Sequence, residues 1–279
     1  MTFWRTQVRR FVLLFEGRTG STYLMEGLAQ HPHIEARGEM LDPLLARGAA
    51  AQLAWTRRYL TPPWRGPYKA IGFKTKLRAI LDPAGFAAIL RTSPVSIIHM
   101  QRRNRIKSVV STFKVMQLNT IKVGEPSAAR FNIYAEDQRP PPPVIDVAKF
   151  REILQQRVQR EEALAAYIAD MQRPTLNLFY EDLLLDRPRV FHEVFDFLGV
   201  GDYPVSGQAI KLTSDDLRQA IVGGLQFGHA GAQPPRNARQ FVVPRPRDRF
   251  VANERDREHQ PRCAVGRGLP RRLVARVVG

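Results

Sequence analysis

Short apolar runs alternate with amphipathic segments along most of this 279-residue chain, and this alternation constrains its fold more than any other feature. Compact apolar runs bounded by turn residues predict buried strands at 12–15, 68–76, 94–102 and 175–184. Spacings of three and four between apolar residues predict helices at 21–30, 83–92, 104–118, 147–171 and 188–199. Strands that alternate with helices pair in parallel and are covered on both sides. The sequence therefore predicts an α/β fold, a single P-loop-like domain with a central parallel sheet flanked by helices on both faces.

The pattern changes near residue 224. Residues 211–224 predict one more capped helix, but 225–279 contain six prolines, twelve arginines, no lysine and no sustained period. A segment of this kind cannot bury enough apolar surface to offset its ordering entropy. We predict a domain at 1–224 and an irregular or disordered arginine- and proline-rich tail at 225–279. The tail is either a basic arm for membranes or polyanions or the product of a frameshift in a GC-rich gene.

Charge and cysteine content limit the class of protein. A formal net charge of +17 favours an anionic partner, which can be a nucleic acid, an acidic membrane surface, an anionic cofactor or a glycan. The single cysteine, Cys263, excludes an internal disulfide and a cysteine-based zinc site. The apolar run at 11–15 is far shorter than the roughly 20 residues that span a bilayer. We expect a cytoplasmic protein, with peripheral contact to an anionic inner membrane as an option.

The segment "FEGRTGSTYL" at 15–24 joins the first predicted strand to the first predicted helix. Two glycines, Gly17 and Gly20, allow a tight turn and close approach of an anion, and the helix start directs N–H groups and a positive dipole end at one point. Ser21 and Thr22 add hydroxyl donors, and Arg18 adds a positive charge. A Walker loop would have four residues between its glycines and a lysine before the serine or threonine. This loop has neither, so its sequence disfavours ATP with Mg²⁺; a serine-capped turn without a ligand stays open.

A second basic stretch, "RRNRIKSVVST", lies where the strand at 94–102 meets the next helix. Arg103 can hold a phosphate with both arms of its guanidinium. Ser111 follows eight residues later, about two helical turns along. The helix lacks the interleaved exposed aromatics and the motif spacings of nucleic-acid-binding modules. We therefore expect no nucleic acid here.

Together these stretches resemble the sulfotransferases that use 3′-phosphoadenosine 5′-phosphosulfate (PAPS). "GRTGSTYL" is similar to the loop of that family that binds the 5′-phosphosulfate, and "RRNRIKSVVS" is similar to its 3′-phosphate motif. "FYEDLLLDRPRVFHEVFDFLGV" at 179–200 is similar to the family's Y-E-D-L strand end and following helix. The resemblance covers roughly residues 10 to 222 and implies PAPS as sulfuryl donor, without a required metal. The cofactor-binding residues that it implies are Arg18, Thr19, Gly20, Ser21, Thr22, Arg103, Ser111 and Tyr180.

"GRTGST", "HP" and "GE" in close succession resemble the bacterial branch that sulfates carbohydrates, lipopolysaccharide or Nod factors. That likeness implies a carbohydrate or glycolipid acceptor and Glu39 as the general base. Arg18 is expected to stabilise charge that develops in the transition state. Lys74, or less favourably Lys76, is expected to face the sulfuryl group or the acceptor.

Several other residues have simpler interpretations. We interpret His31, before Pro32, as part of a helix stop rather than a metal ligand, and His99 as a satisfied core histidine. The basic side of the 147–171 helix is interpreted as a solvated face. We expect residues 119–143 to form a wall of the acceptor site, since loops of this length usually have a role.

Three other functions stay open beside a PAPS-dependent sulfotransferase. One is another P-loop transferase, such as a kinase, which should need Mg²⁺. The second is a non-enzymatic binder of polyanions or nucleic acid, whose affinity should fall steeply with salt. The third is a relative that binds the cofactor without turnover.

Overall fold

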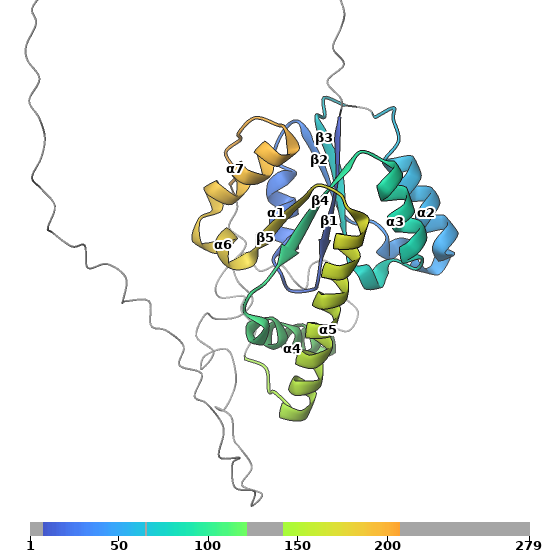
Figure 1. Cartoon of the computed structure of the whole chain (residues 1–279). Coiled ribbons are helices and arrows are strands. Elements are labelled where there is room, and N and C mark those ends of the chain that lie inside the picture. Colours follow the sequence, from blue (N-terminus) through green and yellow to red (C-terminus); the bar gives the residue numbers. More distant parts are fainter. Residues whose placement is uncertain (1–7, 65, 122–141, 207–279) are drawn as a thin grey trace, which may run out of the picture. The chain divides into compact units, whose positions relative to one another are not determined.

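The described residues form a five-stranded sheet with helices around it, in the strand order β2-β3-β1-β4-β5 (Figure 1). The computed structural model describes residues 8–64, 66–121 and 142–206. Within these, the strands are β1 (Arg9–Phe15), β2 (Ile34–Glu39), β3 (Ala70–Thr75), β4 (Val95–Gln101) and β5 (Thr175–Phe179). All four neighbouring pairs are parallel. The predicted parallel sheet is confirmed.

Helices connect the strands throughout the described residues. They are α1 (Ser21–Leu28), α2 (Gly48–Tyr59), α3 (Pro83–Thr92), α4 (Arg105–Ile121), α5 (Val147–Met171), α6 (Tyr180–Leu185) and α7 (Arg187–Leu198). Two short 3₁₀ segments, Asp42–Arg47 and Leu77–Ala79, follow β2 and β3. Within the described part of the chain, no helix is long and apolar enough to cross a membrane.

The side chains of β1 point alternately to two apolar layers. Phe11, Leu13 and Phe15 pack in one core cluster with residues of α1 and α7. Val12 and Leu14 pack in a second cluster with residues of α3 and α5. Because the central strand is buried on both sides, the sequence prediction of helices on both faces is confirmed, and Figure 1 shows the two helical layers.

Neither β2 nor α2 has a counterpart in the sequence prediction. β2 reads "IEARGE", pairs only with β3 at the edge of the sheet, and buries only Ile34. The buried residues of α2 are Gln52 and Thr56, both polar. The amide of Gln52 donates to the carbonyls of Leu41 and Ala79, which satisfies it inside the protein. A polar edge strand and a helix that buries polar residues leave no apolar period to detect.

Two predicted strand boundaries are clearly wrong. β1 begins at Arg9 rather than at residue 12. The strand predicted over 175–184 ends at Phe179, and Tyr180 begins α6. A short helix with acidic residues in its first turn matches the charge preference of a helix start, which explains the early end of the strand. The helix predicted over 211–224, the tail, and most of the 119–143 segment lie outside the described residues, so the domain boundary at 224 stays a prediction.

Candidate functional site

The loop between β1 and α1 lies at the carboxyl end of the central strand, where parallel α/β sheets bind ligands. Two of its residues have positive φ, Arg18 at 66° and Gly20 at 79°. A Cβ atom on Gly20 would lie 2.4 Å from the ring of Tyr180. Glycine is thus required there by backbone conformation and by space.

The loop opens onto the start of α1. Gly20 is the N-cap of α1 and has no side chain that could accept from the first N–H groups of the helix. The first N–H groups of a helix have no partner within that helix, so the start of α1 offers donors and a positive dipole end. The hydroxyl of Thr19 donates to the Glu16 carbonyl at 2.9 Å and is therefore used inside the loop.

Three arginines gather on this loop. Arg157 of α5 donates to the Gly17 carbonyl at 2.8 Å, and Arg102 at the end of β4 donates to the Arg18 carbonyl at 3.0 Å. Burial, together with the positive charges of Arg102 and Arg157, lowers the pKa of Arg18 to about 10, although Tyr180 opposes the shift. Arg18 still carries its charge at neutral pH. An anion in the loop would relieve this repulsion, so the loop suits a negatively charged ligand.

Arg18 joins the two motifs that the sequence singled out. Its Nε donates to the Ser111 hydroxyl at 2.8 Å, across 93 residues of sequence. Ser111 lies on α4 and is only 3% exposed. The β1–α1 loop and α4 therefore meet directly.

Arg103 makes different contacts from those of Ser111. Its guanidinium donates to both carboxylate oxygens of Asp182, at 2.6 and 2.8 Å, and lies 3.9 Å from the centre of the Phe179 ring. The hydrogen bond from Arg103 lowers the pKa of Asp182. The backbone N–H groups of Arg103 and Asn104 both donate to the Glu181 carboxylate. The predicted phosphate clamp is thus bound to a carboxylate of the chain itself.

A lysine–carboxylate cluster lies beside the loop, where β3 and β2 end. Lys74 donates to the Thr22 hydroxyl at 2.7 Å and lies 3.7 Å from the Glu39 carboxylate. Lys76 forms an ion pair with Glu39 and lies 3.8 Å from Asp42. Lys74 lies in β3 and Lys76 just after its end, and both reach the same carboxylate, in keeping with the alternation that predicts them on one side. Glu39, Lys74 and Thr22 therefore form one connected group.

The pKa values in this cluster follow from burial and pairing. Burial alone would raise the pKa of Glu39, but the hydrogen bond from Lys76 and the charges of both lysines lower it overall. Burial lowers the pKa of Lys74, with Glu39 opposing it. Burial raises the pKa of Asp42, and the neighbouring charge of Glu39 adds to this effect. The two lysines thus hold Glu39 in its carboxylate form.

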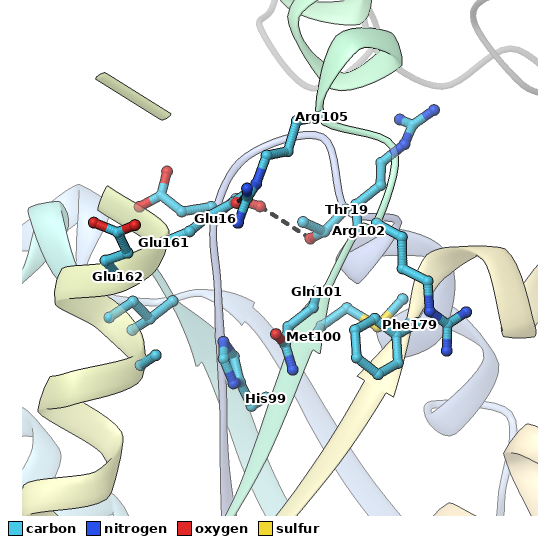
Figure 2. A pocket seen from close by; sticks show the side chains of 13 residues that line it. Glu16, Thr19, His99, Met100, Gln101, Arg102, Arg105, Glu161, Glu162 and Phe179 are labelled. Atoms are coloured by element: carbon cyan, nitrogen blue, oxygen red, sulfur yellow. Dashed lines mark hydrogen bonds and ion pairs between the residues drawn. The ribbon is translucent and has the colours of Figure 1, made fainter. Parts of the chain in front are cut away.

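A pocket of about 420 Å³ adjoins the other side of the loop. Its lining residues come from the loop, the ends of β4 and β5, the start of α4, and α5. They are Glu16, Thr19, His99, Met100, Gln101, Arg102, Arg103, Arg105, Glu161, Glu162, Leu164, Ala165 and Phe179. Figure 2 shows His99 and Gln101 on the sheet, below Thr19 and Arg105. The ring of His99 is buried, pairs with Asn177 at 3.2 Å, and has its pKa lowered by burial. His99 has the polar partner that the sequence predicted.

Sequence reasoning missed residues that support the loop and the cluster. They are Arg102, Arg157, Glu161, Asp42 and Asp182. The interpretation of the basic side of α5 as a solvated face is wrong for Arg157, which is 4% exposed. The i,i+4 spacing of Arg157 and Glu161 does predict their 2.8 Å ion pair, but nothing in the spacing predicts that it is buried.

The two histidines near α1 have structural contacts. His31 Nε2 lies 2.9 Å from the Gly201 carbonyl, and His33 Nδ1 lies 3.0 Å from the Pro67 carbonyl. Across residues 8–64, 66–121 and 142–206, no three His, Cys, Asp or Glu side chains are placed to hold a metal ion.

Neither a model of a known protein family nor a curated protein sequence matches the chain. Solved sulfotransferase structures do resemble it. One from Alicyclobacillus acidocaldarius has 17% identity and a TM-score of 0.43, over 75% of this chain and 88% of that one. Mouse sulfotransferase SULT7A1, solved in complex with PAP (3′-phosphoadenosine 5′-phosphate), has 15% identity and a TM-score of 0.37, over 70% of this chain and 61% of that one.

The sulfotransferase domain from the curacin biosynthetic pathway has 14% identity and a TM-score of 0.39, over 78% of this chain and 81% of that one. At such low identities and scores, the function of this chain has to be argued from its own residues.

Proposed function

We propose that this chain is a PAPS-dependent sulfotransferase that moves a sulfuryl group to a hydroxyl of a carbohydrate or glycolipid. The observation that carries the proposal is the group of contacts around the β1–α1 loop. Arg18 reaches Ser111 on one side, and Thr22 reaches Lys74 and, through it, Glu39 on the other. Anion-binding groups and a carboxylate base thus adjoin the same loop.

The donor set fits a ligand with two separate anionic ends. The β1–α1 loop is the candidate site for the 5′-phosphosulfate. It has no Walker lysine, but the Arg18 charge and the N–H groups at the start of α1 converge there. Ser111 and Arg103 are the candidates for the 3′-phosphate. The ring of Tyr180, which packs against Gly20 and lies 4.5 Å from the Arg102 guanidinium, is a candidate contact for the nucleoside.

When bound, PAPS supplies a sulfuryl group whose bond to the bridging phosphate oxygen breaks as the acceptor oxygen bonds to sulfur. The acceptor hydroxyl loses a proton in this step, and we assign it to Glu39, whose carboxylate is unprotonated and beside the loop. The negative charge that grows on the bridging oxygen requires donors already in place. Arg18, the Thr22 hydroxyl and Lys74 have the charges and positions for that task.

The proposed acceptor class rests on two supports. One is the resemblance of "GRTGST", "HP" and "GE" to carbohydrate-sulfating enzymes. The other is the pair of neighbouring carboxylates, Glu39 and Asp42, beside Lys76, because carboxylates readily accept hydrogen bonds from sugar hydroxyls. The net charge of +17 supports peripheral contact with an anionic membrane, and the single cysteine supports a cytoplasmic location.

Transfer of labelled sulfate from PAPS to a panel of sugars and glycolipids, with and without EDTA, tests the proposal. We expect metal-independent transfer to a carbohydrate hydroxyl and release of 3′-phosphoadenosine 5′-phosphate (PAP). The Glu39→Gln variant should keep PAP binding and lose transfer. Turnover of ATP with Mg²⁺ in place of PAPS would contradict the proposal.

A further inference from the structure

Arg157 is an arginine in the interior of the protein, halfway along α5. It is 4% exposed, and its Nη1 donates to the Gly17 carbonyl of the β1–α1 loop, 140 residues away in sequence. Burying a guanidinium is costly unless it is paired and hydrogen-bonded. Among the described residues its Nε and Nη2 have no hydrogen-bond partner, so the Gly17 carbonyl is the acceptor that its buried guanidinium uses, which points to a role at the loop.

Glu161 extends this contact to the second basic site. One of its oxygens lies 2.8 Å from the Arg157 Nε, and the other accepts from the Arg105 Nε at 2.6 Å. Arg105 is the first residue of α4, the helix that carries Ser111. Glu161 and Arg105 both line the pocket that Figure 2 shows. A continuous path therefore runs from the Gly17 carbonyl through Arg157 and Glu161 to the start of α4.

The contact at Gly17 has a partner at the next residue. Arg102 donates to the Arg18 carbonyl, so two successive loop carbonyls are held by arginines from outside the loop. A trans peptide is planar, and its N–H points opposite to its C=O. Fixing these carbonyls also fixes the N–H groups of Arg18 and Thr19, which point away from the arginines that hold them. Successive N–H groups held in this manner make an anion-binding concavity.

We propose that Arg157 and Glu161 are positioning residues for the anion site. Arg157 holds the loop backbone so that its N–H groups stay directed at the ligand, and Glu161 ties that loop to the start of α4. Stability alone explains this arrangement poorly, since buried ion pairs are often replaceable by apolar residues without loss of stability. The proposed function enters only in naming the ligand, and the effect on the loop is independent of it.

Hydrogen–deuterium exchange of the ligand-free protein tests the positioning directly. Replacing Arg157 by Met keeps bulk but removes the donors. A hydrogen bond from a charged group is worth enough to change local opening by about tenfold or more. We expect at least that acceleration in peptides covering 16–22, and partial recovery of protection in Arg157→Lys. The matched control is Arg151→Met, which changes an exposed arginine on the same helix.

Two exchange results would overturn the proposal. One is unchanged exchange at 16–22 in Arg157→Met. The other is an equal acceleration in β1 and β4, which would make Arg157 a general structural residue. The Glu161→Gln variant tests the contact between Glu161 and the start of α4. Amide exchange at 102–108 should be faster than in the wild type, while exchange in β3 stays unchanged.

Binding measurements then connect the loop to its ligand. Arg157→Met should weaken adenosine 5′-phosphate and PAP by the same factor, about tenfold, because both place a phosphate in the loop. Affinity equal to that of the wild type would contradict the proposal. If the wild-type protein binds neither compound, the proposed function fails, while the exchange result still decides whether Arg157 positions the loop.

Discussion

Replacing Gly20 by alanine tests the loop conformation on which the site depends. Gly20 has φ of 79°, and a Cβ there would lie 2.4 and 2.9 Å from two atoms of the Tyr180 ring. The left-handed conformation costs about 1–2 kcal/mol for a residue with a Cβ. Crowding a packed neighbour costs about 1–3 kcal/mol more, since the Tyr180 ring also packs on Arg102 and cannot move freely.

The two contributions together predict a destabilisation of about 2–5 kcal/mol for Gly20→Ala. A middle value of about 3 kcal/mol lowers the melting temperature by about 6–12 °C in a domain of this size. The double variant with Tyr180→Ala removes the crowding but keeps the strained φ. Relative to Tyr180→Ala alone, Gly20→Ala should then cost only about 1–2 kcal/mol.

Urea unfolding of the four proteins in this cycle provides the free energies. Gly38→Ala is the matched control, because a Cβ on Gly38 would meet no atom within 4 Å and its φ is not positive. We expect Gly38→Ala to change stability little. The reasoning is refuted if Gly20→Ala costs no more than Gly38→Ala, or if its cost is the same with and without the Tyr180 ring.

Three further predictions concern the charged groups. The lowered pKa of Glu39 means that its pairing stabilises the fold above the ordinary glutamate pKa, and that this contribution is lost as pH falls through the folded-state pKa. The difference in unfolding free energy between wild type and Glu39→Gln, measured in urea, should therefore close below about pH 4. A difference that stays constant with pH would contradict this prediction. Asp182→Asn should release the Arg103 guanidinium from its ion pair and tighten PAP binding by up to about fivefold, while the affinity for adenosine 5′-phosphate stays the same. Calorimetry measures both affinities, and an equal change for the two ligands would contradict a role of Arg103 at the 3′-phosphate. Lys74→Met removes a buried charge whose pKa is lowered by burial, and Glu39 keeps Lys76 as its partner, so thermal unfolding should show only a small change in stability. Sulfuryl transfer should fall by about tenfold or more, and retained transfer would exclude Lys74 from the chemistry.

The central layers of the fold were predictable because their sequence signals are local. β1, β3 and β4 are apolar runs, and α5 and α7 have clear helical periods. β2 and α2 escaped prediction since their burial depends on partners: Gln52 is inside because two carbonyls accept its amide protons. Such satisfaction of polar groups is a property of tertiary structure.

In the candidate site, too, local motifs could be predicted from the sequence and tertiary contacts could not. The loop at 16–22 and the Arg103–Ser111 spacing are contiguous motifs, so sequence alone located both, and Glu39 and Lys74 were placed by resemblance and alternation. The contacts of Arg103 with Asp182 and of Arg157 with Gly17 join segments 79 and 140 residues apart. Neither partner has a local signal that distinguishes it from an ordinary surface charge.

Calorimetric titration with PAP, adenosine 5′-phosphate and ATP–Mg²⁺ tests most directly the claim that the loop and α4 form a two-phosphate site. We predict that PAP binds more tightly than the other two, without metal, and that Arg103→Ala reduces PAP to the affinity of adenosine 5′-phosphate. A ligand at 100 times its Kd should also raise stability by about 2.7 kcal/mol. No binding of PAP, or tighter binding of ATP–Mg²⁺, would contradict the account.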